Sequence, residues 1–370
     1  MNSTELRLAK SNNRKYCILV GNGTTAIYLA LFSQDYKNKR IAIPNNVCMN
    51  VLLPIYFSNN IPVFVDIEKE TLGLDIKLLD NQKIDAIIGV HAYGNICNIA
   101  DLEIYCKDNN IFLIEDVAVS QGLKYNTKPL GCFGDVSILS FGSGKVIDIK
   151  HGGAILTDDK NIYDKILTGL KTMKDFKFKD EEKIDEISKK HTKLYNEDYG
   201  NSINKHHKEF KNLCLENKYH FLYKFDKKYL KNLDNKLDIL DTLISTRQSN
   251  AMYLETIFKY SGLNCIKILK PKYNSSFWRF NIFIEDYRDE LFTYLLSKKY
   301  KVSSWYHSVD LLFEERISLE TPVSDWVSKT IINIWVNEEI DRIYLDNISS
   351  DIINFLKAKK CQQNIHYKKQ

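Results

Sequence analysis

The sequence predicts an α/β fold in which helices cover a mostly parallel, seven-stranded sheet and a smaller α+β domain follows at the C-terminal end. Three observations support this prediction. Short β-branched or aromatic runs alternate with helical patterns through the first 158 residues. Several of these runs are nearly all apolar, as expected of strands that are buried on both faces. Beyond about residue 230 the pattern changes to a long helix, an aromatic strand and another helix.

Seven segments have the length and composition of strands. They are Tyr16–Val20, Arg40–Pro44, Pro62–Asp66, Ala86–His91, Phe112–Asp116, Val136–Phe141 and Gly153–Thr157. The segments between them, such as Thr24–Phe32 and Ala100–Lys107, carry apolar residues at helical spacing. Because ligands of such sheets bind beyond the carboxyl ends of the strands, functional residues are expected at those ends.

The chain of 370 residues exceeds the usual size of a single core, which predicts a large domain over residues 1–230 and a small domain over residues 231–370. Lysine, asparagine and tyrosine dominate a polar insertion at about residues 171–230. This composition predicts solvated helices or a mobile insertion, and a partner-binding arm is the alternative. The small domain is expected to contain a helix, a strand and a second helix, at Leu233–Tyr260, Phe277–Ile284 and Asp289–Ser297.

The overall composition excludes several classes of protein. Hydrophobic residues make up 44% of the chain and charged residues 27%, which indicates a folded protein. The net charge of +5 is spread over segments of mixed sign, which argues against nucleic-acid binding. The eight cysteines form no C-x-x-C pair, as expected of reduced thiols in the cytoplasm. No apolar run approaches the ~18 residues of a membrane span, and the N-terminus lacks the apolar core of a signal peptide.

The turn Gly21–Thr25 leads from the first predicted strand directly into a helix. Backbone amides and the positive end of the helix dipole converge at such a point and favour an anion. Gly23 permits close backbone approach, and Thr24 and Thr25 add hydroxyl donors. An ordinary helix cap made by Asn22 or Thr24 explains the same residues, so the turn alone does not decide between the two interpretations.

Two further residues carry a distinct chemistry. Asp116 ends an apolar strand, where a carboxylate is costly unless a positive group meets it. A protonated pyridine nitrogen is such a group, and a solvated cap is the alternative. Lys145 lies five residues after Ser140 in a partly apolar setting that favours a neutral amine, and neutral amines form imines.

An amine nucleophile, a buried carboxylate and a phosphate cradle are together what pyridoxal 5'-phosphate requires. The sequence therefore predicts this cofactor, with Lys145 as the catalytic residue that binds it covalently and then moves the substrate proton. Ser140 is expected to add a hydroxyl to the phosphate site from the end of its strand. The prediction depends on the co-occurrence of these groups and not on any one of them.

Other residues are assigned no catalytic role. His206 and His207 are adjacent, so on a helix they point to different sides, and no metal site is predicted. His91 and His307 are candidates for lining the cleft, although core or surface positions are equally expected. The aromatic residues of the C-terminal part are expected in the small-domain core rather than in a sugar-stacking surface. They are Phe277, Trp278, Phe280 and Trp305.

Seven sequence runs, in their order and spacing, resemble the DegT-like nucleotide-sugar aminotransferases. The runs are Gly23–Ala26, Pro62–Asp66, Val90–Gly94, Ile114–Ala118, Gly131–Asp135, Ser140–Lys145 and Gly152–Ala154. The resemblance is strong over residues 15 to 158 and fainter beyond, where Arg288–Leu291 and Trp305–His307 look like landmarks of that family's small domain. It implies the pyridoxal-phosphate-dependent transferase fold of type I, and a homodimer with active sites at the subunit interface.

The same resemblance implies a reaction and residue roles. The reaction moves an amino group, commonly from glutamate, onto a nucleotide-linked keto sugar for the biosynthesis of a surface polysaccharide. The implied roles are Lys145 at the Schiff base, Asp116 at the ring nitrogen, and Gly23, Thr24 and Ser140 at the phosphate.

Several residues depart from the family pattern. Val119 stands where a glutamine close to the cofactor's 3-hydroxyl is usual. Cys48 occupies the position of the aromatic residue that commonly stacks on the ring, which implies a thiol contact with the cofactor instead. Lys150–His151 replaces a glycine and an acidic residue. The asparagine that normally reaches the neighbouring subunit's phosphate has only Asn201 and Asn204 as candidates.

Two alternative functions remain open from the sequence. One is a sugar dehydratase of the same fold that uses pyridoxamine phosphate; its relatives replace the Schiff-base lysine with histidine, so Lys145 argues against it. The other is a non-catalytic binding or regulatory protein that keeps the fold and has lost the substrate site, as the changes at Val119 and Cys48 suggest.

Overall fold

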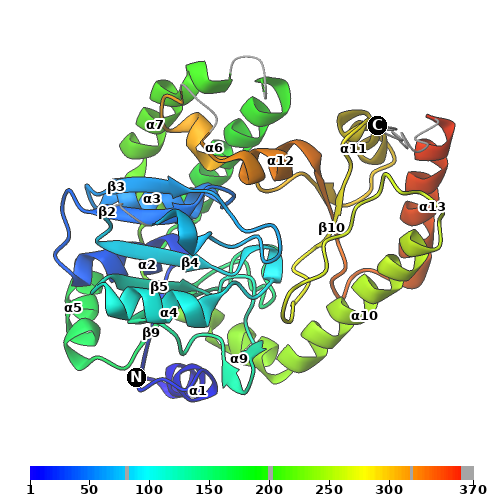
Figure 1. Cartoon of the computed structure of the whole chain (residues 1–370). Helices are drawn as coiled ribbons and strands as arrows, with labels where there is room; N and C mark the ends of the chain where they lie inside the picture. Colours follow the sequence, from blue (N-terminus) through cyan, green and yellow to red (C-terminus); the bar gives the residue numbers. More distant parts are fainter. Residues whose placement is uncertain (80–82, 199–202, 317–319, 360–370) are drawn as a thin grey trace.

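The computed structural model describes residues 1–79, 83–198, 203–316 and 320–359. Its central sheet contains the seven predicted strands in the order β1-β9-β8-β5-β4-β2-β3 (Figure 1). They are β1 (Tyr16–Val20), β2 (Arg40–Pro44), β3 (Ile61–Val65), β4 (Ala86–Val90), β5 (Phe112–Asp116), β8 (Val136–Ser140) and β9 (Gly153–Thr157). Only β9 runs antiparallel to its neighbours in this sheet, which confirms the prediction of a mostly parallel sheet.

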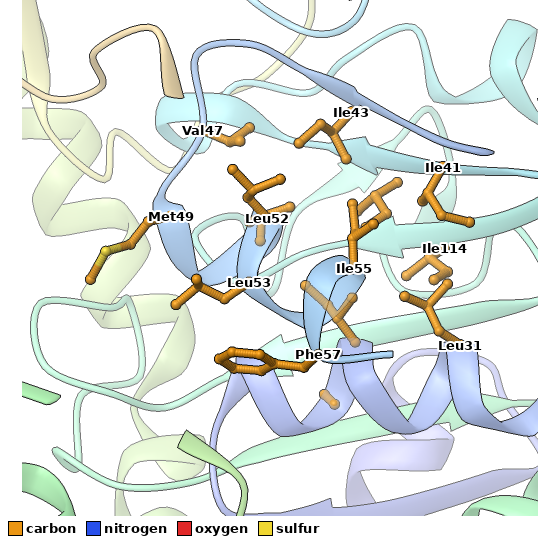
Figure 2. Packing of buried hydrophobic residues seen from close by; sticks show 14 of the residues in the cluster. Leu31, Ile41, Ile43, Val47, Met49, Leu52, Leu53, Ile55, Phe57 and Ile114 are labelled. Atoms are coloured by element: carbon orange, nitrogen blue, oxygen red, sulfur yellow. The ribbon is translucent and has the colours of Figure 1, made fainter. Parts of the chain in front are cut away.

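Successive strand residues point to opposite sides of this sheet, and both sides are apolar. Helices therefore cover both faces. Ile41 and Ile43 of β2 belong to the apolar cluster of α2, α3 and α5, whereas Ala42 belongs to the cluster of α1 and α4. Figure 2 shows side chains of α3 packed against those of α2, β2 and β5. The helices are α1 (Ser3–Ser11), α2 (Gly23–Ser33), α3 (Met49–Phe57), α4 (Ile99–Asp108) and α5 (Lys160–Lys171).

The polar insertion forms helices beside α3, drawn in green in Figure 1. They are α6 (Phe178–Asp198), η3 (Ile203–His206), α7 (His207–Glu216) and α8 (Lys218–Phe221). Their outer faces are solvated as predicted, but Ile187, Tyr195 and Phe210 are buried in the cluster that contains α2 and α3. The segment is therefore part of the core packing of the large sheet, which its polar composition alone did not indicate.

The C-terminal part contains a second sheet, in the order β10-β12-β11. Its elements are α10 (Leu240–Lys259), β10 (Phe280–Phe283), α11 (Arg288–Ser297), β11 (Val302–Ser303), α12 (Pro322–Thr330), β12 (Ile331–Ile334) and α13 (Arg342–Ala358). The strand predicted at Phe277–Ile284 is shorter than expected and begins at Phe280, and Phe277 itself has a left-handed backbone with φ of 47°. The single helix predicted at Leu233–Tyr260 is wrong: α9 (Leu230–Asp238) ends at Ile239, which has non-helical backbone angles, and α10 begins after it.

Helix α10 packs on both sheets. Ile244, near its start, lies in the cluster on the large sheet, whereas Leu254 and Phe258 lie in the cluster on the small sheet. We therefore propose that the boundary between the domains, expected at residue 230, falls within α10. The remaining short elements are η1 (Ile76–Leu78), η2 (Ala92–Gly94), β6 (Lys124–Tyr125), β7 (Lys128–Pro129), η4 (Lys227–Tyr229) and η5 (Val309–Leu312).

Candidate active site

A cavity of about 580 Å³ lies at the carboxyl ends of β5 and β8. This volume is typical of small-molecule sites. Six of the seven predicted site residues line it, namely Gly23, Thr24, Cys48, Asp116, Ser140 and Lys145. The structure thus brings the lysine, the carboxylate and the glycine-rich turn, which are far apart in the sequence, to one place.

The glycine-rich turn ends in a capped helix. Asn22 caps α2, because its Oδ1 accepts a hydrogen bond from Thr25 N at 2.7 Å. The amides of Gly23 and Thr24 come earlier in the same helical turn and have no intrahelical acceptor. Since both residues line the cavity, the positive end of α2 opens into it. The helix cap and an open helix end, which were alternatives at the level of sequence, are therefore compatible, and the binding of an anion there stays a prediction.

Thr25 differs from expectation. Its side chain is fully buried, its hydroxyl donates to Phe221 O at 3.2 Å, and it lies outside the cavity lining. The predicted contribution of the Thr25 hydroxyl to ligand binding is therefore not supported. The hydroxyl instead joins α2 to the end of α8, which positions the glycine-rich turn against the polar insertion.

Asp116 is the carboxylate of the cavity. It is only 4% exposed at the end of β5, and its Oδ1 accepts a hydrogen bond from Ala118 N at 2.9 Å. Burial raises the pKa of the Asp116 carboxyl, while this hydrogen bond and the charge of Lys145 oppose the rise. A positively charged partner in the cavity would stabilise the ionised form.

Glu115, the preceding residue, points to the other face of β5 and has a structural role. Its carboxylate accepts hydrogen bonds from Gly131 N at 2.8 Å, Phe133 N at 2.9 Å and Ser137 Oγ at 2.8 Å, and it lies 3.2 Å from His91 Nε2. His91 Nδ1 accepts from Cys97 N, so geometry favours a neutral imidazole that donates to Glu115. His91 is therefore a core residue and does not line the cavity.

Lys145 lies on a loop in which the preceding residue, Gly144, is hydrogen-bonded through both its backbone N–H and its carbonyl group. Asp148 Oδ2 accepts from Gly144 N at 2.7 Å, and Trp278 Nε1 donates to Gly144 O at the same distance. The second bond comes from the C-terminal part of the chain, so the orientation of the lysine loop depends on both sheets. Lys145 itself is partly exposed and lines the cavity.

Cys48 and Asn50 form the wall at the start of α3. Burial raises the pKa of the Cys48 thiol, so the group facing the cavity is a neutral thiol. Asn50 was not predicted as a site residue. Its Oδ1 is buried without a hydrogen-bond partner among the described residues, and its backbone oxygen accepts from Thr24 Oγ1 at 3.4 Å. The cavity therefore offers a free amide oxygen to a ligand.

The opposite wall of the cavity comes from the polar insertion, which sequence reasoning missed. The lining residues of α6 include three carboxylates, Glu181, Glu182 and Asp185. The N-terminal end of α6 is held by Asp180, which accepts from His220 Nδ1 at 2.8 Å and pairs with Lys174. No local pattern in this lysine-rich segment distinguishes a cavity wall from a solvated helix, so only the packing of α6 identifies these residues.

The remaining candidates lie elsewhere. His307 is buried and stacks on Tyr195 with ring centroids 4.3 Å apart. Phe280 belongs to the apolar cluster of the small sheet, as predicted, whereas Trp278 belongs to a cluster that it shares with residues of the large domain such as Tyr93. The described ranges contain no group of side chains suited to hold a metal ion. Each helix in the described part of the chain is too short or too polar to cross a lipid bilayer.

Asn201 lies outside the described residues, and so does the side chain of Asn204. The expected contact of an asparagine with a second subunit therefore remains a prediction.

A buried carboxylate and a lysine that share a cavity at the strand ends of a seven-stranded α/β sheet define a class of cofactor-dependent transferases. The model of the DegT/DnrJ/EryC1/StrS aminotransferase family matches residues 2–353, and the chain belongs to this family.

Pairwise alignments with individual relatives cover less of the chain than the family model does. GDP-perosamine synthase of Escherichia coli O157:H7 is 34% identical over 167 residues, which cover 44% of this chain and 46% of that enzyme. dTDP-3-amino-3,6-dideoxy-alpha-D-galactopyranose transaminase of Aneurinibacillus thermoaerophilus is 30% identical over 167 residues with the same coverage. The alignments thus span just under half the length of these curated relatives.

Among solved structures, an aminotransferase of this family from Brucella abortus superposes with a TM-score of 0.73. The two chains are 20% identical, and the superposition covers 95% of this chain and 89% of the other. At this identity the likeness establishes the fold.

Proposed function

We propose that the chain is a pyridoxal-phosphate-dependent aminotransferase that moves an amino group from an amino-acid donor, expected to be glutamate, to a nucleotide-linked keto sugar. The observation that carries this proposal is the shared cavity of Lys145 and Asp116 with the open end of α2. Family membership and the functions for which the two curated relatives are named support the same reaction class.

The residues present suit pyridoxal phosphate. Asp116 offers a buried carboxylate for a protonated ring nitrogen, and Gly23, Thr24 and Ser140 offer amides and hydroxyls for a phosphate. Asn50 Oδ1 offers an acceptor for a ring hydroxyl, the role for which Val119 is unsuited. When bound, the cofactor supplies a carbonyl carbon for amines and an electron sink for the carbanion at the substrate carbon.

The chain's own groups perform the remaining tasks. Lys145 Nζ would supply the amine that the cofactor's carbonyl carbon accepts and the group that moves a proton at the substrate carbon. Asp116 keeps the ring nitrogen protonated through their mutual attraction in a buried setting. The hydrogen bonds to Gly144 hold the lysine loop, so the amine stays within reach of both positions.

We further propose that the enzyme works in the cytoplasm as a homodimer and serves the biosynthesis of a surface polysaccharide. The resemblance of its sequence runs to the nucleotide-sugar aminotransferases supports the homodimer and the pathway, and the absence of C-x-x-C pairs from the sequence supports the cytoplasm. The acidic face of α6 borders the same cavity and is expected to contribute to the choice of substrate.

The decisive experiment compares the parent protein with Lys145→Ala. The parent is expected to gain a visible absorbance band with pyridoxal phosphate, and borohydride is expected to fix the cofactor on the peptide that contains Lys145. The Lys145→Ala variant should show neither change. A parent protein that stays colourless and indifferent to the cofactor would favour a non-catalytic relative.

A half-reaction tests the substrate class. The protein is loaded with pyridoxamine phosphate and offered a panel of nucleotide keto sugars and simple keto acids. Return of the absorbance band with a nucleotide sugar, together with an aminated product in the mass spectrum, supports the proposal. Conversion by keto acids alone rejects the sugar assignment, and a deoxygenated product without new nitrogen points to a dehydratase.

A further inference from the structure

The side chains around the cavity leave a bound phosphate short of positive charge. Among the described lining residues the cations are Lys145 and Lys150, while four carboxylates line the same space. A phosphate ester carries close to two negative charges near neutral pH. The donors at the open end of α2 are neutral groups, and the helix dipole supplies the equivalent of about half a charge. Charge compensation therefore depends on the two lysines.

Lys145 cannot serve as that cation throughout the reaction, because its nitrogen is the nucleophile toward the cofactor's carbonyl carbon. A nitrogen that reacts at the carbonyl carbon stays at that end of the cofactor and cannot also contact the phosphate. Lys150 is then the remaining ammonium group among the described residues that line the cavity.

The backbone places Lys150 close to the phosphate loop. Two residues further on, Gly152 N donates to Gly21 O at 2.9 Å, and Gly153 pairs with Val20 at the end of β1. A β-carbon added to Gly153 would meet the backbone of Asn22 at 2.8 Å, which shows how closely the two segments pack. Lys150 thus belongs to a segment that is packed against the turn leading into α2.

The conformation of Lys150 is also constrained. Its φ of 60° lies in the left-handed region, which is unfavourable for a lysine. Asp148 holds it there, because its Oδ1 accepts from Lys150 N at 3.0 Å while its Oδ2 accepts from Gly144 N at 2.7 Å. One carboxylate therefore sets the position of Lys150 relative to the loop of Lys145. No carboxylate of the described residues forms an ion pair with the Lys150 side chain.

We propose that Lys150 binds the cofactor's phosphate group and supplies the cation that the neutral cradle of Gly23, Thr24 and Ser140 lacks. The inference rests on the proposed cofactor and adds a binding residue at a position where a glycine is usual in proteins that this sequence resembles. A diphosphate in the substrate offers the same chemistry, so the experiment must separate the two sources of phosphate.

The test compares two ligands that differ only in the phosphate. Dissociation constants of pyridoxal phosphate and of pyridoxal are measured by absorbance titration of the cofactor-free protein, for the parent, Lys150→Ala, Lys150→Arg and Lys124→Ala. Alanine retains the β-carbon, so the backbone cost at this position is unchanged. Lys124 is an exposed lysine outside the cavity and serves as the matched control.

Lys150→Ala is expected to weaken pyridoxal phosphate about tenfold or more, the size of a lost hydrogen bond to a charged group, without changing the affinity for pyridoxal. Lys150→Arg should recover most of the loss, and Lys124→Ala should match the parent. Thermal unfolding of the cofactor-free variants establishes that each is folded to the same extent.

Two outcomes overturn the inference. Equal affinities of parent and Lys150→Ala for pyridoxal phosphate reject it, and so does an equal loss for both ligands. If the affinity for the cofactor is unchanged but the KM for a nucleotide sugar rises, the phosphate at Lys150 belongs to the substrate. A parent protein that binds neither ligand rejects the proposed function as well, whereas failure of the variant comparison alone leaves that function standing.

Discussion

Asp116 and Lys145 line one cavity from neighbouring parallel strands: Asp116 ends β5, and Lys145 lies on the loop that leaves β8. In the sequence the two strands are separated by the β6–β7 hairpin. Their pairing places a carboxylate and an amine on the same side of the sheet edge, as the chemistry of a pyridine cofactor requires. The same geometry leads to several predictions.

Asp116→Asn is expected to lower the rate of the half-reaction with glutamate by about 100-fold, the loss typical of removing one preorganised electrostatic partner. The amide cannot keep the ring nitrogen protonated. Because burial raises the pKa of Asp116, the neutral side chain should not reduce the free energy of unfolding. Stopped-flow absorbance gives the rate and urea denaturation gives the stability; a parent-like rate would contradict the assigned role.

Glu115→Gln, one residue away, is expected to have the opposite profile. Three donors of the loop and strand around residues 131–137 point at this carboxylate, and an amide would replace one acceptor oxygen with a donor. The free energy of unfolding should fall by about 3 kcal/mol, as for other buried charged networks that lose one partner. Urea denaturation of the cofactor-free protein measures this loss, and stability equal to the parent would show that the network is unimportant.

Gly153→Ala is expected to disturb the phosphate loop. A β-carbon at this position would lie 2.8 Å from Asn22 C and 2.8 Å from Leu139 O, both backbone atoms that cannot move independently. We expect a loss of about 1–3 kcal/mol in the free energy of unfolding, the usual cost of overpacking, together with weaker binding of pyridoxal phosphate.

Gly142→Ala is the matched control for this prediction. Its β-carbon would meet Ser140 Oγ at 3.8 Å, an ordinary contact, so its stability should equal that of the parent. Equal stability of the two alanine variants would mean that the β1–β9 contact tolerates more volume than the structure indicates.

His191 is expected to make the protein sensitive to acid. Burial lowers its pKa to about 3, and the ring packs against Trp305 with centroids 5.6 Å apart. Below about pH 6.5, the ordinary pKa of histidine, the unfolded chain takes up a proton at this residue that the folded chain does not. The free energy of unfolding should therefore decrease as the pH falls through this window, by about 2 kcal/mol at about pH 5.

The variant His191→Phe tests this prediction. It keeps an aromatic ring at a position where Nε2 has no hydrogen-bond partner among the described residues. Unfolding free energies near neutral pH and near pH 5 should differ less in the variant than in the parent. An identical pH effect in both proteins would assign the acid sensitivity to other groups, such as His151, whose pKa burial lowers to about 4.

The strands and most of the site were predictable because they depend on local patterns. Strands of the large sheet are buried on both faces, so they appear as apolar runs, and each predicted strand matched to within one residue at its ends. The break at Ile239 was not predictable, because a helical apolar pattern continues across it and Leu233 of α9 and Ile244 of α10 pack in the same apolar cluster.

By itself the sequence determined the order of strands and helices and the polar residues that end them, since both follow from the periodicity of apolar side chains and from the cost of an unpaired charge in a strand. Only the tertiary structure decided which residues share the cavity. The Thr25 hydroxyl donates to Phe221 O outside the cavity, whereas residues of α6, Asn50 and Lys150 line it. Contacts between segments tens of residues apart depend on how whole helices pack, and no local pattern carries that information.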